Sequence, residues 1–181
     1  MLKQIAQKVE DLRRLIDDSR SASFLLAVSG GMDSMCMADL FLKAVGAELF
    51  AVAHCNFALR GEESDGDEML VRKWAEENDV RFFVQRFDTM GYAAERGISI
   101  EMAARDLRYT WFAELCSAYK FDVLVVAHNA NDNAETLMLN LLRGTGLNGM
   151  HGMAEVQRRA DFGLELVFRP LLGFTRKQIE G

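Results

Sequence analysis

The chain has 181 residues, of which 50% are hydrophobic and 27% charged, so it can bury one substantial core. Its 27 acidic residues outnumber its 21 Lys and Arg residues, and the net charge of −6 excludes a generally basic nucleic-acid-binding surface but not a local basic patch. The three cysteines lie far apart without a C-x-x-C pair, which argues against a disulfide framework, a zinc ribbon or a cysteine-ligated cluster.

The N-terminal residues do not resemble an export signal, because charged side chains interrupt the first 20 residues where a signal would have an apolar run. Nor does any stretch of about 18 uncharged apolar residues predict a membrane span. We therefore expect a cytoplasmic protein that has no contact with a membrane.

The first predicted element is an amphipathic helix within residues 1–20. Ile5, Val9, Leu12 and Ile16 recur at helical spacing, so they share one face while charged residues occupy the other. We expect this apolar face to pack on the rest of the chain.

Short apolar runs alternate with helical patterns along the rest of the chain. The runs predict buried strands at 24–28, 49–53, 81–87, 122–127 and 166–168. Helices are expected at 33–45 with Gly46 as the stop, from the acidic stretch through Asn78, after a cap at Ser99, and at 131–143. The less regular segments are an acidic turn at 62–68, a loose stretch at 88–97 and a mobile glycine-rich loop after Arg143.

Strands that alternate with helices of about a dozen residues imply parallel strands joined by helical crossovers. The predicted fold class is therefore α/β, a doubly wound and mainly parallel sheet with helices on both faces. We expect residues 1–181 to form a single domain.

The turn between the first strand and its helix carries the strongest chemical signal. Its sequence is Ser29-Gly30-Gly31-Met32-Asp33-Ser34. Two adjacent glycines let the backbone approach an anion, the helix start favours negative charge, and two hydroxyls add donors. No Lys follows the glycines, so this is not the G-x-x-x-x-G-K-[ST] loop of terminal phosphoryl transfer. A purely structural bend is the alternative.

These six residues resemble the S-G-G-x-D-S signature of the PP-loop ATP pyrophosphatases, a group within the adenine-nucleotide α-hydrolase-like fold. The resemblance implies that they bind ATP: Ser29, Gly30, Gly31, Met32, Asp33 and Ser34. It also implies that Asp33 lies at the reacting phosphate or its Mg²⁺. Without the resemblance, Asp33 is a carboxylate that stabilises the helix start by at most about 1 kcal/mol.

Residues 54–65 leave the second strand at the same edge of the predicted sheet. Their sequence, His-Cys-Asn-Phe-Ala-Leu-Arg-Gly-Glu-Glu-Ser-Asp, resembles the H-V-N-H-G-L-R-G-E-E-S-D segment of the tRNA(Ile)-lysidine synthetases. Phe57 departs from that segment, which usually has a second histidine there. We expect Arg60 to contact lysine or tRNA, whereas His54 alone indicates a structural strand-end histidine and the acidic residues a solvated turn.

The helix after residue 99 presents Glu101, Arg105 and Arg108 on one face. The expected buried face beside it consists of Ala104, Leu107, Trp111 and Leu115. Two arginines one turn apart can neutralise a polyphosphate or bind a tRNA phosphate, although a surface pair of Glu101 with Arg105 is the alternative. Because residues 104–109 resemble the family's A-R-x-x-R-Y element, we assign both arginines to the transition-state charge.

Residues 127–136, Ala-His-Asn-Ala-Asn-Asp-Asn-Ala-Glu-Thr, resemble the family's A-H-x-x-D-D-x-x-E-T motif. His128, Asp132 and Glu135 are spaced to share one face at the start of a helix. Asn131 replaces the first aspartate of the motif, which leaves Asp132 as the relevant carboxylate. Zinc is a rival ligand for this set, but the neutral Asn131 and the lack of a further His or Cys nearby argue against it. Asn131 or Asp132 could also cap the helix.

Two C-terminal segments complete the resemblance, which runs from residue 24 to the last residue. Residues 141–147 resemble an L-L-R-G-S-G-L loop, and residues 169–172 an R-P-L-L segment. Arg143 either complements the helix dipole or contacts nucleotide or tRNA. Apolar residues at helical spacing are expected in the core: Met35, Met37, Met138 and Leu141.

The resemblance implies the N-terminal catalytic domain of a tRNA(Ile)-lysidine synthetase. In that family O2 of the wobble cytidine of CAU-anticodon isoleucine tRNA attacks the α-phosphate of ATP, used with Mg²⁺, and the ε-amine of L-lysine then displaces AMP at C2. Asp33, His128 or Asp132 would transfer protons and bind lysine, with Glu135 and Arg143 as further lysine or tRNA contacts. We expect this chain to lack the family's C-terminal tRNA-binding domains and therefore to bind tRNA weakly. The sequence leaves open whether the protein forms a homodimer.

Rival functions stay open as well. A PP-loop tRNA thiolase would use paired cysteines, which the chain lacks. An amidotransferase-like or NAD-synthetase-like ligase does not account for L-R-G-E-E-S-D. A non-catalytic ATP or AMP sensor would not require Asp33, Arg105 and Asp132.

Overall fold

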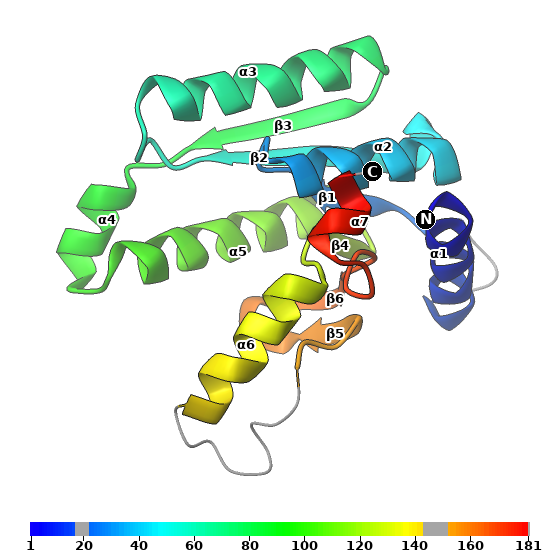
Figure 1. The fold of residues 1–181 in the computed structure, drawn as a ribbon. Coiled ribbons are helices and arrows are strands. Elements are labelled where there is room, and N and C mark those ends of the chain that lie inside the picture. Colours follow the sequence, from blue (N-terminus) through cyan, green and yellow to red (C-terminus); the bar gives the residue numbers. More distant parts are fainter. Residues whose placement is uncertain (17–21, 143–151, 181) are drawn as a thin grey trace.

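The computed structural model describes residues 1–16, 22–142 and 152–180. Six strands form one sheet in the order β3-β2-β1-β4-β6-β5 (Figure 1). They are β1 (Phe24–Ala27), β2 (Phe50–Asn56), β3 (Arg81–Arg86), β4 (Val123–Val126), β5 (Val156–Arg159) and β6 (Leu164–Phe168). The pairs β1/β2, β1/β4, β2/β3 and β4/β6 are parallel, whereas the edge strand β5 runs antiparallel to β6. The predicted fold class is confirmed.

Helices cover both faces of the sheet (Figure 1). They are α1 (Leu2–Ile16), α2 (Met32–Val45), α3 (Glu62–Glu77), α4 (Thr89–Arg96), α5 (Ile100–Tyr119), α6 (Ala130–Leu142) and α7 (Arg176–Glu180). Residues of α1, α2, α3 and α7 share one core with one face of the sheet, and α5 packs on the other face with α4 beside it.

The alternation of side chains along β1 divides the two cores. Phe24 and Leu26 lie in the core on the α2 side, and Leu25 lies in the core on the α5 side. The ring of Phe24 packs edge-on against Phe41 of α2, with the ring centres 5.6 Å apart. Burial on both faces explains why the strands are continuous apolar runs in the sequence.

The N-terminal helix is amphipathic as predicted. Ile5, Val9 and Leu12 are fully buried, and each buried aliphatic side chain contributes about 1.5–3 kcal/mol relative to exposure. Lys8 on the same helix pairs with Glu155 just before β5. Residues 17–20, the end of the predicted range, lie outside the described residues.

The predicted helix boundaries at two positions are confirmed. Ser99 caps α5, because its Oγ accepts a hydrogen bond from the backbone N–H of Met102 at 3.2 Å. Gly46 ends α2 with φ of +84°, a conformation that favours glycine.

Two segments predicted to be irregular are helical. Residues 62–68 form the first turns of α3, where the carboxylates of Glu62, Glu63 and Asp65 lie near the positive end of the helix dipole. Residues 88–97 contain α4, which Asp88 caps by accepting the N–H of Gly91 at 2.9 Å. Clusters of charged and small residues suggested turns, but the same residues are favoured at helix starts.

The sequence analysis missed β5 and α7. β5 is a four-residue edge strand without a fully buried residue, and its polar sequence, Val-Gln-Arg-Arg, has no apolar run. α7 spans only five residues, too few for a helical pattern to repeat.

Two predictions about burial were wrong in part. On α5 the buried side chains include Ala103, Phe112 and Leu115, whereas Ala104, Leu107 and Trp111 are only partly buried. Of the predicted buried face only Leu115 is therefore buried, and Trp111 packs beside the buried residues against Phe87, with ring centres 6.1 Å apart.

Met35 and Met37 lie in or against the core as predicted. Met138 is 62% exposed, because α6 extends away from the sheet (Figure 1). The side chain of Leu141 lies outside the described residues.

Candidate functional site at the carboxyl edge of the sheet

The centre of the sheet creates a crevice where the strand order reverses. The chain leaves β1 for β2 on one side, and β4 lies on the other side of β1. The loops that follow β1 and β4 therefore diverge, and ligands of open α/β sheets bind at such points. The glycine turn follows β1, and the motif of residues 127–136 follows β4, so the fold places both at this crevice.

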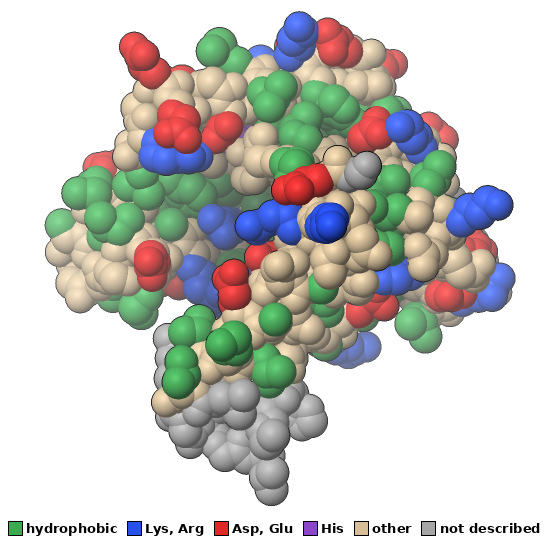
Figure 2. All heavy atoms as spheres, viewed as in Figure 1, with side chains coloured by type: hydrophobic (Ala, Val, Ile, Leu, Met, Phe, Trp, Pro, Cys, Tyr) green, Lys and Arg blue, Asp and Glu red, His purple; other side chains and the backbone are tan. Residues whose placement is uncertain are grey.

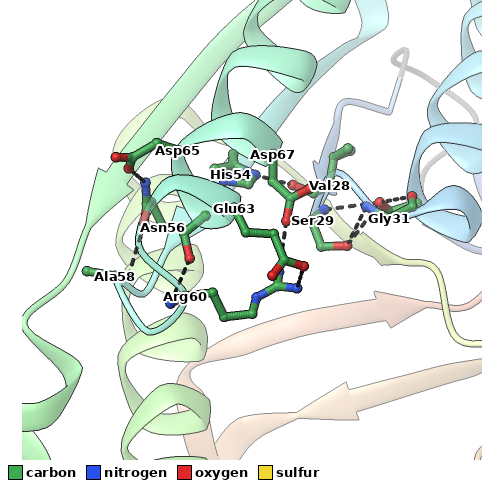
Figure 3. A network of polar contacts seen from close by, with 12 residues as sticks. Val28, Ser29, Gly31, His54, Asn56, Ala58, Arg60, Glu63, Asp65 and Asp67 are labelled. Carbon is green, nitrogen blue, oxygen red and sulfur yellow. Dashed lines mark hydrogen bonds and ion pairs between the residues drawn. The ribbon is translucent and has the colours of Figure 1, made fainter.

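The glycine turn is held by its two serines. The backbone N–H of Ser29 donates to Ser34 Oγ at 3.1 Å, Ser34 Oγ donates to the Gly31 carbonyl at 2.8 Å, and the Gly31 N–H donates to Ser29 Oγ at 3.3 Å (Figure 3). The N-cap residue of α2 is Gly31, which has no side chain. No capping side chain therefore accepts hydrogen bonds from the N–H groups of the first turn. This turn can bind an anion.

Gly30 must be glycine for two reasons. Its φ is +89°, and a Cβ placed on it would lie 2.8 Å from the Cβ of Asp67 on α3. Two Cβ atoms do not approach each other so closely in real structures, so a side chain at position 30 would clash with α3. This helix packs directly on the turn. The helix that begins within the L-R-G-E-E-S-D segment thereby supports the glycine turn.

An anchored loop precedes α3 (Figure 3). Asn56 Nδ2 donates to Asp65 and to Glu68, each at 3.0 Å, and Asn56 Oδ1 accepts the N–H of Ala58 at 3.0 Å. The bond from Asn56 holds the pKa of the Asp65 carboxyl below its usual value, as it does for Glu68. These acidic residues therefore order the loop rather than form only a solvated turn.

His54 has a structural role. It is buried, and its Nδ1 lies 2.9 Å from the carbonyl oxygen of Val28 on the neighbouring strand segment (Figure 3). This agrees with the interpretation of a strand-end histidine.

Asp33, in the first turn of α2, meets the β4 loop. Its Oδ2 accepts a hydrogen bond from Asn129 Nδ2 at 2.8 Å and lies 3.7 Å from Nε of Arg176. Its Oδ1 is buried and has no hydrogen-bond partner among the residues that the structure describes. A buried carboxylate oxygen without a partner is costly unless a ligand or ion satisfies it.

Asn129 and Asp132 cap α6 together. Asn129 Oδ1 accepts the N–H groups of Asn131 at 2.8 Å and Asp132 at 3.1 Å, while Asp132 Oδ2 accepts the N–H of Asn129 at 2.9 Å. This is a reciprocal capping box. The prediction that Asn131 or Asp132 caps the helix holds in part: Asp132 belongs to the capping box, but Asn129 occupies the N-cap position because the helix begins at Ala130.

His128 lies between β4 and this cap. Burial lowers the pKa of its imidazole, the nearby cations of Arg169, Arg108 and Arg105 lower it further, and Asp132 opposes them. Its Nδ1 is buried without a hydrogen-bond partner among the described residues. A neutral imidazole at neutral pH can accept a proton.

Three adjoining cavities meet at Ser29. The first, of about 310 Å³, runs between the ends of β1, β2 and β4 and α5, and its lining includes Ser34, Arg108, Tyr109 and His128. The second, about 450 Å³, is lined by the glycine turn, Ala127 and Arg176. The third, about 190 Å³, lies toward the start of α3. In Figure 2, Lys and Arg side chains gather where the surface is hollowed between α5 and α7.

The third cavity contains Phe57 and Arg60. The ring of Phe57 stacks on Phe87 with centres 5.6 Å apart, and the guanidinium of Arg108 lies 5.1 Å from the Phe57 ring centre. Arg60 donates to Glu63 at 2.6 Å and to Asp67 at 2.8 Å (Figure 3). Arg60 therefore lines the cleft but is held by two carboxylates, and its contact to lysine or tRNA stays a prediction.

The structure brings together only part of the predicted set. The residues that line the cleft or its capping box are Ser29, Gly31, Met32, Asp33, Ser34, Arg60, Arg108, His128 and Asp132. Arg105 is exposed with its guanidinium 5.4 Å from the ring centre of Tyr109, and Glu135 is exposed one turn beyond Asp132. Arg143 lies outside the described residues.

The sequence analysis assigned no role in the site to two residues, Asn129 and Arg176, although both lie in the stretch that resembles the family. Asn129 is buried and links Asp33 to α6, and Arg176 reaches both Asp33 and Asp132. The motif match around Asn129 was a signal, but its partner is 96 positions away in the chain. None of the helices in the described part of the chain is both long and apolar enough to cross a membrane.

Comparisons with known proteins show the family of this chain. A family model described as a PP-loop domain matches residues 2–181. The tRNA(Ile)-lysidine synthase of Porphyromonas gingivalis strain W83 is 49% identical over 156 residues, which cover 86% of this chain and 33% of that protein. That of Chlorobaculum tepidum is 42% identical over 174 residues, which cover 94% of this chain and 50% of that protein. The chain thus spans about a third to a half of the length of these curated relatives.

Solved structures share the fold. The U34-tRNA thiolase NcsA from Methanococcus maripaludis, solved with its 4Fe-4S cluster, has a TM-score of 0.72 at 18% identity, covering 98% of this chain and 61% of the thiolase. A glutamine-dependent NAD+ synthetase from Acinetobacter baumannii has a TM-score of 0.62 at 17% identity, covering 98% of this chain and 31% of the synthetase. From its motif, its cleft and the family match, this chain belongs to the PP-loop family of ATP-binding domains.

Proposed function

We propose that this chain is the ATP-binding catalytic part of an enzyme that joins L-lysine to C2 of the wobble cytidine in CAU-anticodon isoleucine tRNA. The observation that carries the proposal is the cleft, in which the glycine turn, Asp33, His128, Asp132 and Arg108 converge. The relatives named tRNA(Ile)-lysidine synthase support the same reaction. Such an enzyme would act in the cytoplasm, where ATP and tRNA are present.

ATP would bind with its phosphates at the glycine turn. The first-turn N–H groups of α2 are the donors at that place, and the hydroxyl of Ser29 can add one by turning away from Ser34, whose own proton is held by the Gly31 carbonyl. The base and sugar would then occupy the cavity of about 310 Å³, whose lining includes apolar side chains such as Val126 and Phe112.

The donor set also fits Mg²⁺. Asp33 has a buried carboxylate oxygen without a partner, and Asp132 presents a second carboxylate beside it, since Arg176 reaches both. Mg²⁺ binds hard oxygen ligands and commonly takes one or two carboxylates together with substrate phosphates. Asp33 and Asp132 would hold the ion, and its chemistry there would be to polarise phosphate oxygens.

The first reaction step would join O2 of the cytidine to the α-phosphorus and break the bond to pyrophosphate. The helix N-terminus would stabilise the charge of the departing pyrophosphate, and Arg108 would lie on the opposite wall of the cleft to balance charge on the α-phosphate. Arg105 lies one helical turn away at the exposed margin of the cleft. It would contact phosphates of the tRNA backbone.

The second step would join the ε-nitrogen of lysine to C2 and release AMP. The ε-ammonium must first lose a proton, and His128, neutral because burial lowers its pKa, is the base that the cleft offers. Asp132 would hold the ammonium near it. Arg60, Glu135 and Arg143 remain proposals for contacts to lysine or tRNA.

The cysteines disfavour the thiolase alternative. Cys55 lines the cleft, but burial raises the pKa of its thiol to about 12, so it is protonated at neutral pH. Cys36 packs against the core on the α2 side, whereas Cys55 and Cys116 pack against the core on the α5 side, and all three are free thiols.

The test is pyrophosphate release from ATP, measured with tRNA and with lysine omitted in turn. We expect release to require the tRNA, and incorporation of labelled lysine into the tRNA to require both. Sulfur transfer without lysine would favour a thiolase, and tight ATP binding without any release would favour a sensor. Full lysine incorporation by an Asp33→Ala variant would show that the role assigned to Asp33 is wrong.

A further inference from the structure

Arg176 brings a cation to both candidate catalytic carboxylates. Its Nε lies 3.7 Å from Asp33 Oδ2, and its Nη2 lies 3.8 Å from Asp132 Oδ1. Asp33 belongs to α2 and Asp132 to α6, so a single side chain from the C-terminal helix α7 connects the two loops of the crevice.

The backbone around Arg176 is fixed to the start of α6. Its N–H donates to Asn131 Oδ1 at 3.0 Å, and the N–H of Ala130 donates to the Phe174 carbonyl at 2.9 Å. Asn131, the departure from the family motif, thus positions α7. The segment that carries Arg176 is therefore part of the wall of the site.

The guanidinium itself is held only loosely. Both distances are too long for hydrogen bonds, and the side chain is 52% exposed, whereas those of Asp33 and Asp132 are 19% and 28% exposed. The cation thus covers the two carboxylates from the solvent side. It also lines the cavity of about 450 Å³ next to the glycine turn, so a phosphate bound at that turn would lie within its reach.

We propose that Arg176 is a positioning residue that holds Asp33 and Asp132 together in the nucleotide-free domain and yields them to the divalent cation that arrives with ATP. A guanidinium and a divalent ion repel one another and compete for the same oxygens, so Arg176 weakens metal binding until phosphates offer it a new partner. The proposal rests on the proposed function, which places ATP and Mg²⁺ in this cleft.

The experiment is a titration of the nucleotide-free chain with Mn²⁺, followed by electron paramagnetic resonance of the free ion. An Arg176→Gln variant is expected to bind Mn²⁺ about threefold to tenfold more tightly than the unaltered chain. This corresponds to about 0.7–1.4 kcal/mol at 1.4 kcal/mol per tenfold, the range for two partly exposed ion pairs. Arg176→Lys keeps the charge and should restore the weaker affinity.

Lys177→Gln is the matched control, because Lys177 is the next residue of α7, is exposed and carries the same charge. We expect it to leave Mn²⁺ binding unchanged. Equal affinities of the unaltered chain and Arg176→Gln would overturn the proposal, and so would an equal gain in Lys177→Gln, which would indicate an effect of net charge alone.

A second variant pair locates the carboxylates. In the double variant Arg176→Gln, Asp33→Asn the gain in Mn²⁺ affinity should disappear, and its persistence would overturn the proposal. ATP binding, measured separately by calorimetry, distinguishes failure of this inference from failure of the proposed function. Loss of the Arg176 effect with normal ATP binding refutes only this inference, whereas no ATP binding by the unaltered chain refutes the proposed function.

Discussion

The contact between α3 and the glycine turn predicts a large effect of Gly30→Ala. A non-glycine residue at the observed φ of +89° costs about 1–2 kcal/mol. The new Cβ would also lie 2.8 Å from the Cβ and 3.1 Å from the Cα of Asp67, an overpacking that costs about 1–3 kcal/mol. We expect the free energy of unfolding to fall by about 2–5 kcal/mol, or the turn to shift and release part of that strain.

Gly163→Ala is the control for the backbone component. Gly163 has φ of +72°, and a Cβ there would meet no atom within 4 Å. This variant should therefore lose only about 1–2 kcal/mol. Urea unfolding followed by circular dichroism gives both values, and the difference between them isolates the contact with Asp67.

ATP affinity separates a shifted turn from a merely destabilised fold. If the turn moves to avoid Asp67, Gly30→Ala should lose ATP affinity at temperatures where it is still folded, and Gly163→Ala should not. Adding Asp67→Gly, which removes the obstructing Cβ, should restore part of the loss. Equal effects of Gly30→Ala and Gly163→Ala on stability, together with normal ATP binding, would refute the reasoning.

Two further predictions concern the β4 loop. If neutral His128 is the base, lysine incorporation should persist below pH 6.5 and fall only as pH drops through its lowered pKa, since protonation then removes the base. A pH profile with its acid limb at or above 6.5, or one unchanged in His128→Gln, would contradict this role. Asn129→Ala removes the cap of α6 and the hydrogen bond to Asp33, so we expect a loss of stability of about 1–3 kcal/mol and weaker ATP binding. Asn129→Asp keeps the cap but places a second carboxylate beside Asp33. It should retain stability better than Asn129→Ala in urea unfolding, and equal losses would show that capping is unimportant here.

Much of the fold could be predicted because it is encoded in local patterns. The buried strands are apolar runs, since each lies between two layers of helices, and Ser99 and Gly46 mark helix ends by their own chemistry. The predictions failed for segments whose residues favour more than one local structure. Acidic residues suit both a turn and a helix start, so α3 was predicted to begin too late and α4 was missed.

Part of the candidate site could likewise be predicted from local sequence patterns. The chain order of strand, S-G-G turn and helix is enough to predict where an anion would bind, because parallel strands end at one edge and helix N-termini attract negative charge. The motif after β4 likewise placed His128 and Asp132 near that edge.

Which of these side chains contact one another depends on how distant segments pack. The contact of Gly30 with Asp67, the bond from Asn129 to Asp33 and the reach of Arg176 to two carboxylates each join segments far apart in the chain. Such contacts leave no periodicity in the sequence, because they depend on how the helices pack against the sheet rather than on the neighbours of each residue. The same packing leaves Arg105 at the exposed margin and brings Arg108 into the cleft, although the two residues are one helical turn apart.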